Sequence, residues 1–379
     1  MLPLPAGTDF GIYTLLDSLG HGGFAFVYLA RDKQLGRRVC IKEHAPEGIC
    51  ERDAESGEIV PLPGMERAFT ASLADFQREA ELLANLHHAQ VPAVHEIFEA
   101  GGTAYVVTDY AEGLSLPQWL AEDAERRHQL PLLLESVLRI LRSLHREGVL
   151  HRDIKPGHMI VDAAGRMRLV DFGAAVPAGA RHTPVFTPPY SPPEQNMQGT
   201  AGAWSDLYSL AASFRSVLLH EPVQDALQRL ECDRLRPLAD NDSLRREFPE
   251  PFLRSIDRAL SLLPEERFES AEAWLAALAA GEVPRSSRRR TVALAACAAI
   301  ALAAFALVAR SLIAQPPAPP AGPPPAAPAT TPPQPAPPSA KPPVEVSPDP
   351  WDEDYLLQEG KDMRERMLKF VDGAPSSTP

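Results

Sequence analysis

The distribution of proline sets the strongest limit on where this chain can fold. The chain has 379 residues and 40 prolines, and prolines crowd residues 316–349. Proline fixes φ and lacks a backbone N–H, so such low-complexity sequence cannot build a packed core. We therefore expect one large folded domain before this tract, with appendages after it.

A stretch without charged residues runs from Thr291 to Ala309, just before the proline tract. At about 1.5 Å per residue it can cross most of a bilayer core of about 30 Å. We predict a transmembrane helix over residues 291–313, in contact with the lipid bilayer; a buried alanine-rich helix is the alternative. Arginines at 285 and 288–290 precede the span, and after Arg310 the next basic residue is Lys341. The positive-inside rule then predicts a single-pass protein of the inner (cell) membrane, with its N-terminal domain in the cytoplasm and its C-terminal tail outside.

The predicted organisation is therefore a domain at 10–280, a basic linker at 281–290, the span, a spacer at 314–349 and a tail at 350–379. A proline-rich spacer is extended, at about 3.1 Å per residue. Apolar residues of the tail recur at roughly helical spacing, although Gly360 interrupts them. Both a short docking helix and a solvated tail remain open, and no partner of the tail is indicated.

Composition excludes several classes of function. The net charge of −13 argues against a nucleic-acid partner, because such proteins need basic surface to neutralise phosphates. The four cysteines show no CxxC spacing, so neither a zinc site nor a disulfide framework is indicated, and a reducing compartment fits them. The first residues lack a basic segment followed by an apolar run, so no cleavable secretory signal is expected.

Three motifs in the first half of the chain suit a nucleotide. Gly20 and Gly22 precede a strand-like pattern, and glycine lets backbone N–H groups approach phosphate oxygens. Lys42 lies near the end of the strand pattern RRVCIKE, where a phosphate-pairing lysine is expected. A helical pattern follows, and it carries Glu79 beside its apolar face, from which we expect Glu79 to meet Lys42.

The segments LHREGVLHRDIKP, LVDFGAA and PPYSPPEQ follow in this order. With the preceding motifs they resemble the bacterial Hanks-type (eukaryotic-like) serine/threonine protein kinases over nearly all of residues 10–280. The resemblance implies an α+β, bilobal protein-kinase fold, with a small β-rich N-lobe and a larger helical C-lobe, followed here by the transmembrane helix and the proline-rich tail. It also implies ATP and Mg²⁺ as cofactors, and protein substrates with Ser/Thr acceptors.

Site roles follow from the resemblance, residue by residue. Asp153 is expected to be the catalytic base, Lys155 to neutralise the γ-phosphate, and Asp171 to hold Mg²⁺. Thr187 corresponds to the threonine that shapes the acceptor site. Structural roles are implied for Asp206, which would brace the catalytic loop, and for an ion pair between Glu194 and Arg267.

The resemblance also implies the nucleotide-base site. Its apolar walls are expected from Val27, Cys40 and Ile160. Thr108 is expected at the back of the pocket, and the backbone from Asp109 to Ala111 is expected to hydrogen-bond the base.

The most consequential departure from the family pattern is His158, which stands where the family has a metal-binding asparagine. Imidazole nitrogen suits transition metals better than Mg²⁺, so His158 is a metal-ligand candidate that predicts a shift from Mg²⁺ toward Mn²⁺. The competing interpretation is that His158 only packs or hydrogen-bonds near Asp153. Two functions therefore remain open, an active kinase and a nucleotide-binding pseudokinase that acts as a membrane-tethered scaffold.

Overall fold

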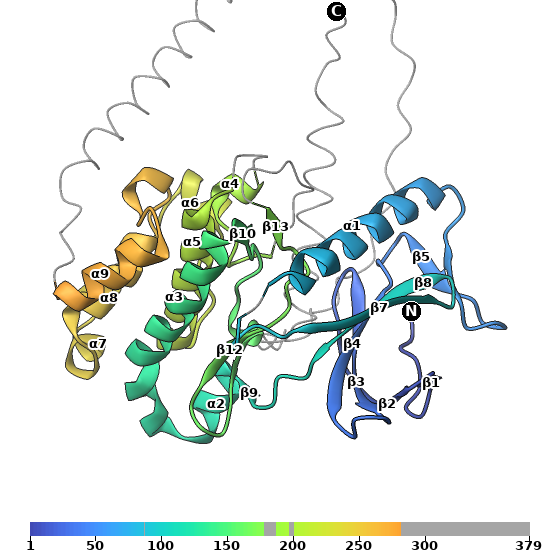
Figure 1. Ribbon diagram of the computed structural model, residues 1–379. Coiled ribbons are helices and arrows are strands. Elements are labelled where there is room, and N and C mark those ends of the chain that lie inside the picture. Colours follow the sequence, from blue (N-terminus) through green and yellow to red (C-terminus); the bar gives the residue numbers. More distant parts are fainter. Residues whose placement is uncertain (87, 178–186, 197–200, 282–379) are drawn as a thin grey trace, which may run out of the picture. The chain divides into compact units, whose positions relative to one another are not determined.

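The N-terminal lobe is built on an antiparallel sheet with the strand order β1-β2-β3-β4-β8-β7 (Figure 1). The computed structural model describes residues 1–86, 88–177, 187–196 and 201–281, which all belong to one structural unit. The sheet's strands are β1 (Asp9–Phe10), β2 (Tyr13–His21), β3 (Ala25–Asp32), β4 (Arg38–His44), β7 (Val94–Ala100) and β8 (Thr103–Asp109).

Strand β4 shows how the sheet separates core from site. Successive side chains of a strand point to opposite faces. Val39 and Ile41 are fully buried in the lobe's core. Cys40 and Lys42, which alternate with them along the strand, are partly exposed. The alternation therefore turns Cys40 and Lys42 away from that core.

Helix α1 (Glu66–Ala84) runs along the sheet, above it in Figure 1. Its buried residues Phe69, Phe76, Ala80 and Leu83 recur with helical spacing. The helix predicted around Glu79, with this apolar face, is thereby confirmed.

The insertion between β4 and α1 forms a hairpin of β5 (Cys50–Arg52) and β6 (Ile59–Pro61). A buried carboxylate ties it to the sheet. Glu43 is 0% exposed and accepts hydrogen bonds from Arg52 Nη2 (2.6 Å), Arg52 Nη1 (3.2 Å), Tyr28 Oη (2.7 Å) and Tyr105 Oη (2.6 Å). These donors saturate the carboxylate, which satisfies the condition for burying a charge.

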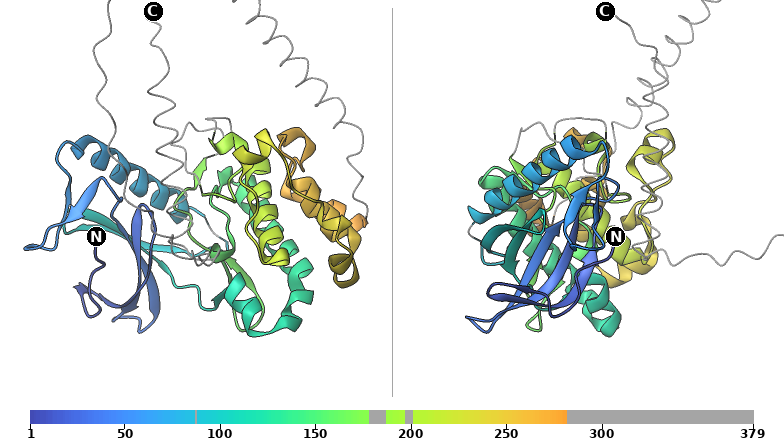
Figure 2. Two further views of the ribbon diagram at one scale, coloured as in Figure 1. Left: turned by 180° about the vertical axis from the view of Figure 1, so that it is seen from behind. Right: turned by 90° about the vertical axis from the view of Figure 1, so that its right-hand side faces the viewer.

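The C-terminal lobe is mainly helical (Figures 1 and 2). Its helices are α2 (Leu116–Glu122), α3 (Leu130–Arg146), α4 (Pro193–Asn196), α5 (Ala203–Leu219), α6 (Ala226–Glu231), α7 (Asp242–Glu247), α8 (Glu250–Ala259) and α9 (Ala271–Ala280). Helix α5 is buried along most of its length and serves as the central helix. Most of its buried side chains are apolar or carry a hydroxyl group, as an all-round buried helix requires, and the buried charges Asp206 and Arg215 are exceptions.

Short strands of this lobe carry the loops of the site. They are β9 (Leu114–Ser115), β10 (Val149–Leu150), β11 (Met159–Val161), β12 (Met167–Leu169) and β13 (Val176–Pro177). They pair as β12-β11-β9 and β10-β13. The bilobal kinase architecture expected from the sequence is thus present.

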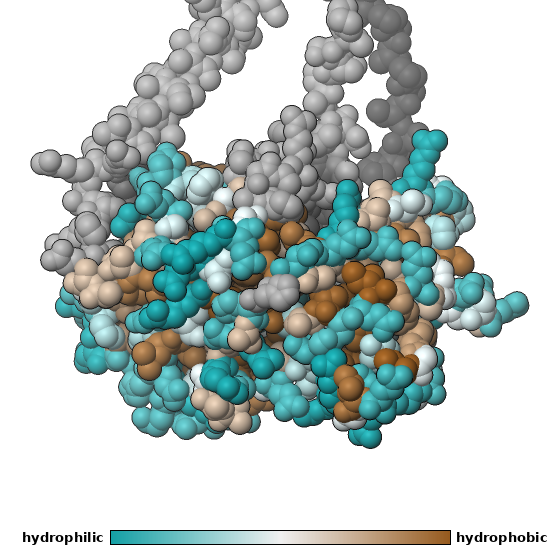
Figure 3. Space-filling model, in the orientation of Figure 1, coloured by the Kyte–Doolittle hydropathy of each residue, from teal (hydrophilic) through white to brown (hydrophobic). Residues whose placement is uncertain are grey.

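Hydrophilic residues cover most of the face seen in Figure 3, with hydrophobic residues in small separate patches. None of the helices in the described residues has both the length and the apolar character needed to cross a bilayer. The predicted span 291–313, the spacer 314–349, the tail 350–379 and the linker after Gly281 lie outside the described residues.

Candidate active site

The loop after β10 carries the predicted catalytic residues, and Asp206 of α5 holds its backbone. Asp206 accepts hydrogen bonds from the backbone N–H groups of His151 (2.9 Å) and Arg152 (2.8 Å). His145 lies with Nε2 2.8 Å from the same carboxylate. Arg152 has a φ of 67°, a left-handed conformation that is uncommon for a residue with a side chain. The fully buried Asp206 stabilises this turn, as the sequence predicted.

Asp153 lies at the centre of the site. Thr187 Oγ1 donates a hydrogen bond to Asp153 Oδ1 (2.8 Å), and Lys155 Nζ lies 3.9 Å from Asp153 Oδ2. Burial raises the pKa of Asp153, but the charge of Lys155 and the hydrogen bond from Thr187 outweigh it, so the pKa lies below its usual value. The carboxylate is therefore ionised and able to accept a hydroxyl proton at neutral pH.

Lys42 reaches across from β4 and forms an ion pair with Asp171 Oδ1. Burial lowers the pKa of Lys42, yet the negative charges of Asp171 and Glu79 raise it above its usual range. The pKa of Asp171 is well below its usual value, because the charge of Lys42 outweighs burial. Both groups are therefore charged.

The expected contact between Lys42 and Glu79 differs from the observed one. Among the described residues, no ion pair joins these two side chains, and Lys42 contacts Asp171 instead. Burial raises the pKa of Glu79 to about 8, although the charge of Lys42 opposes this. Glu79 remains in the same neighbourhood, because a Cβ built on Gly173 would lie 2.9 Å from Lys42 Nζ and 3.8 Å from Glu79 Oε1. The Lys42 amine thus has two carboxyl groups nearby, and it forms its ion pair with Asp171, the one with the lower pKa.

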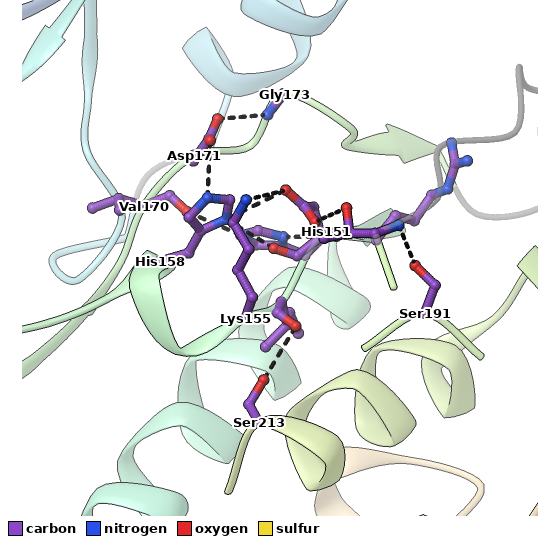
Figure 4. Close-up of polar contacts among 12 residues, drawn as sticks. His151, Lys155, His158, Val170, Asp171, Gly173, Ser191 and Ser213 are labelled. Carbon is purple, nitrogen blue, oxygen red and sulfur yellow. Dashed lines mark hydrogen bonds and ion pairs between the residues drawn. The ribbon is translucent and has the colours of Figure 1, made fainter. Parts of the chain in front are cut away.

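His158 lies between the two aspartates, and Figure 4 shows its ring beside Asp171. Its Nδ1 donates a hydrogen bond to the backbone carbonyl oxygen of Asp153 (2.9 Å), and its Nε2 lies 3.0 Å from Asp171 Oδ2. Ligand atoms of Asp153, His158 and Asp171 all lie within 4.8 Å of one another. Two carboxylates and an imidazole are a donor set that fits a divalent cation. His158 thus hydrogen-bonds Asp153, as the competing interpretation expected, but it does not point away, because it faces Asp171; its metal binding stays a prediction.

The glycine loop joins β2 to β3. A Cβ built on Gly20 would meet no atom within 4 Å, and one built on Gly22 would meet only the carbonyl oxygen of Ala25, at 4.0 Å. Packing does not require glycine at these positions. The open space beside them allows a ligand to approach the backbone closely, and the strand pairing is also irregular between Ser18 and Gly20.

The predicted base-site residues come from both lobes. Val27 lies on β3 and Cys40 on β4, Thr108 pairs with Cys40 in register on β8, and Asp109 ends β8 with Ala111 just after it. Ile160 lies on β11 of the other lobe. The side chains of Val27, Cys40 and Ile160 are partly exposed within strands whose neighbours are buried. Burial raises the pKa of the Cys40 thiol to about 11, so it stays uncharged.

Two supporting contacts complete the site. Arg267 donates to both oxygens of Glu194, at 2.7 and 3.0 Å, which confirms the predicted ion pair. The rings of His151 and Phe172 pack with centroids 4.4 Å apart. Thr183, which the sequence offers as a candidate for regulatory phosphorylation between Asp171 and Glu194, lies outside the described residues.

The sequence analysis missed the contact that joins β4 to α1. His44 Nε2 lies 2.9 Å from Ser72 Oγ, and Nδ1 lies 3.3 Å from Thr103 Oγ1. The rings of Phe69 and Phe76 lie 5.2 and 5.3 Å away. Burial lowers the pKa of His44 to about 4, so the ring is neutral. The sequence feature that could have indicated this contact was the position of His44, two residues after Lys42 and therefore on the same face of the strand.

Comparison with known proteins agrees with this geometry. The sequence profile described as "Protein kinase domain" matches residues 13–276. The solved structure "PpkA-294 apo form" superposes with a TM-score of 0.64 at 30% identity, covering 73% of this chain and 99% of that one.

Curated relatives are bacterial proteins named as serine/threonine-protein kinases. PksC of Streptomyces coelicolor is 31% identical over 69% of this chain and 48% of its own length. PrkC of Bacillus subtilis is 28% identical over 69% of this chain and 39% of its own. PknB of Mycobacterium tuberculosis is 28% identical over 68% of this chain and 41% of its own. The match thus spans less than half the length of each of these relatives.

Proposed function

The chain belongs to the protein kinase family, and on that premise we propose that it is an ATP-dependent serine/threonine protein kinase. The observation that carries the proposal is the meeting of Lys42, Asp153, Lys155 and Asp171 in one charged cluster from separate segments. None of these charges is needed to pack the core. The names of the bacterial relatives support serine and threonine as acceptors.

The residues suggest how the reaction proceeds. Asp153 orients the acceptor hydroxyl and takes its proton as the hydroxyl oxygen bonds to the γ-phosphorus of ATP. The bond between that phosphorus and the bridging oxygen breaks, and ADP leaves. Lys155 neutralises the charge that develops on the transferred group, and Lys42 pairs with the phosphates of ATP. Thr187 holds Asp153 in the orientation that accepts the proton.

Asp171 and His158 would hold the divalent cation that kinases use. When bound, such an ion neutralises the β- and γ-phosphates and lowers the barrier to their separation. Mg²⁺ is the expected ion for Asp171, and Mn²⁺ is the alternative because of His158. Gly20 and Gly22, which have no side chain, would let the loop backbone approach the phosphates closely. Val27, Cys40 and Ile160 would enclose the base between Thr108 and the backbone from Asp109 to Ala111.

Transfer of radiolabelled phosphate from ATP tests this function. The full-length chain should label itself or a generic protein acceptor on serine or threonine, and Asp153→Asn should lower the rate by about 10²- to 10⁴-fold. An exposed carboxylate gives the matched control, since Asp75→Asn should leave transfer unchanged; Asp75 is 54% exposed. Labelling on tyrosine alone would refute the acceptor class.

The second candidate is a nucleotide-binding pseudokinase that acts as a scaffold. The observation that favours it is His158 in place of the family's metal-binding asparagine. Nucleotide binding without transfer, with either Mg²⁺ or Mn²⁺, would select this function over the first.

We also propose that the kinase is tethered to the cell membrane through residues 291–313, with the catalytic part in the cytoplasm. The uncharged stretch and the arginines before it support this. Full-length protein should sediment with membranes and need detergent for release. A tag placed after Pro379 should be open to protease from outside the inner membrane. Full-length protein in the soluble fraction would refute the tether, and a protected tag would refute the orientation.

A further inference from the structure

We infer that His158 makes the group of Asp153, His158 and Asp171 a binding site for a first-row divalent transition-metal ion, taken up directly by the protein without a nucleotide. The ligands are His158 Nε2 and Asp171 Oδ2. The inference deepens the proposed function, and only its consequence for phosphotransfer rests on that function. Binding of the metal ion alone is a separate property of the folded chain.

The hydrogen bonds of the ring select which nitrogen can bind a metal. The backbone carbonyl oxygen of Asp153 can only accept, so His158 Nδ1, at 2.9 Å, carries the donated proton. This bond directs Nε2 toward Asp171. A metal-binding histidine characteristically has its other nitrogen held in this way by a carbonyl or carboxylate. His158 is only 8% exposed, so its ring cannot turn freely to another partner.

The separation of the two ligand atoms suits one shared ion. His158 Nε2 and Asp171 Oδ2 lie 3.0 Å apart. Neighbouring corners of an octahedron are about 3.0 Å apart when each ligand is about 2.1 Å from the ion, whereas tetrahedral Zn²⁺ sites need about 3.4 Å. The pair is therefore placed for a six-coordinate ion without movement of either side chain.

Lys42 does not occupy this side of Asp171. The lysine contacts Oδ1, whereas His158 faces Oδ2 of the same carboxylate. Asp153 Oδ2 lies 3.5 Å from His158 Nδ1, on the side of the ring away from the metal-binding nitrogen, so Asp153 is near enough to hold a water ligand of the ion. Asp171 Oδ1 is thus paired with the amine of Lys42, whereas Asp171 Oδ2 and Asp153 Oδ2 face the imidazole of His158.

The ligand types decide which ions bind. Mg²⁺ prefers oxygen ligands and gives up its waters reluctantly, so it uses nucleotide phosphates to complete its site. Imidazole raises the affinity for Mn²⁺, Fe²⁺ or Co²⁺ by supplying nitrogen. The amide oxygen that the family uses at this position offers no such preference. A preformed nitrogen and oxygen pair should hold these ions before ATP arrives.

Mn²⁺ alone is the probe that tests this site. Loss of the free Mn²⁺ signal in electron paramagnetic resonance measures binding to the full-length chain in the absence of nucleotide. Electron spin-echo modulation of the bound ion then reports whether an imidazole nitrogen is a direct ligand. We expect tight binding in preference to Mg²⁺, with nitrogen modulation. These readouts need no phosphotransfer and no variant.

Two variants sharpen the result. His158→Asn should weaken Mn²⁺ binding by at least about 10-fold and remove the nitrogen modulation, and His158→Gln should do the same. The matched control is His128→Asn, because His128 is exposed (59%) and distant in sequence, and it should bind as the wild type does. Circular dichroism establishes that each variant is folded.

Equal Mn²⁺ affinity of wild type and both folded His158 variants would overturn the inference, as would nitrogen-free binding in the wild type. Binding of Mn²⁺ only when ATP is present would also overturn it, even if the chain transfers phosphate. Conversely, nitrogen-coordinated Mn²⁺ in a chain that transfers no phosphate would support the inference and refute the proposed kinase function.

Discussion

The neighbouring residues Lys42 and Glu43 of β4 belong to two different clusters of charged side chains. Donors of the chain saturate the carboxylate in the Glu43 cluster, which is therefore complete, whereas the Lys42 cluster is incomplete. Glu43 is fully buried, and Arg52, Tyr28 and Tyr105 donate to both of its oxygens. On the opposite strand face, Lys42 lies against Asp171 in a cluster with more carboxyl groups than amines. A completed cluster stabilises the fold, whereas an incomplete one near the surface is suited to bind a charged ligand.

The largest effect should come from the incomplete cluster. Lys42→Met should lower phosphotransfer by about 10³-fold, since a preorganised charge opposite the phosphates is lost. The free energy of unfolding should change by less than about 2 kcal/mol, because Asp171 is 34% exposed and keeps His158 as a neighbour. Lys33→Met, at an exposed ion pair, is the control and should alter neither quantity. Undiminished transfer by Lys42→Met would show that another cation performs its role.

The completed cluster should respond in the opposite way. Glu43→Gln should lower the free energy of unfolding by about 3 kcal/mol, because it leaves Arg52, whose side chain is only 13% exposed, without a counter-charge. Transfer per folded molecule should stay within about twofold. Urea denaturation gives the first quantity and the rate at low urea the second. The control is Glu112→Gln at an exposed ion pair, with an expected loss below about 1 kcal/mol. Equal losses in both variants would contradict a structural role for the Glu43 cluster.

His44 extends the comparison to pH. The unfolded ring takes up a proton near its usual pKa of about 6.5, but the folded ring does so only near pH 4. Stability should therefore fall as the pH is lowered through this window, by up to about 3 kcal/mol, and stay constant above it. His44→Gln should lack this part of the acid sensitivity in urea denaturation. The same pH profile in wild type and variant would show that His44 is not held neutral by burial.

The smallest effect concerns a single hydrogen bond to Asp153. Thr187→Val should lower kcat/KM for the acceptor by about fivefold, which corresponds to about 1 kcal/mol for one hydrogen bond. Thr187→Ser keeps the donor and should restore most of the rate. A rate for Thr187→Ser no higher than that of Thr187→Val would assign the effect to shape and not to the hydrogen bond.

The two clusters also differ in how well sequence reasoning anticipated them. Asp153 and Asp171 stand in short motifs, because their chemistry requires certain residue types in a certain order. Glu43 and Arg52 carry no motif, since any set of donors that saturates a buried carboxylate would serve. The one available signal was a charged residue at an apolar position of the β4 alternation.

The sequence could not decide which carboxylate forms the ion pair with Lys42. The sequence analysis gave Glu79 as the partner of Lys42 and Asp171 as a metal ligand, and the chain order is the same whichever carboxylate pairs with the lysine. The ion pair with Asp171 depends on where α1 lies against the sheet, which is set by long-range packing such as that of His44. Likewise, the substitution at His158 was visible, but the hydrogen bond that directs its Nε2 was not.

Thermal unfolding of the full-length chain with and without ATP and a divalent metal ion tests the division between the two clusters most directly. A ligand that binds only the folded state raises the unfolding temperature according to its affinity. We predict the same upward shift in wild type and Glu43→Gln, the latter from a lower starting temperature, and little or no shift in Asp171→Asn. A full shift in Asp171→Asn, or its loss in folded Glu43→Gln, would contradict the account.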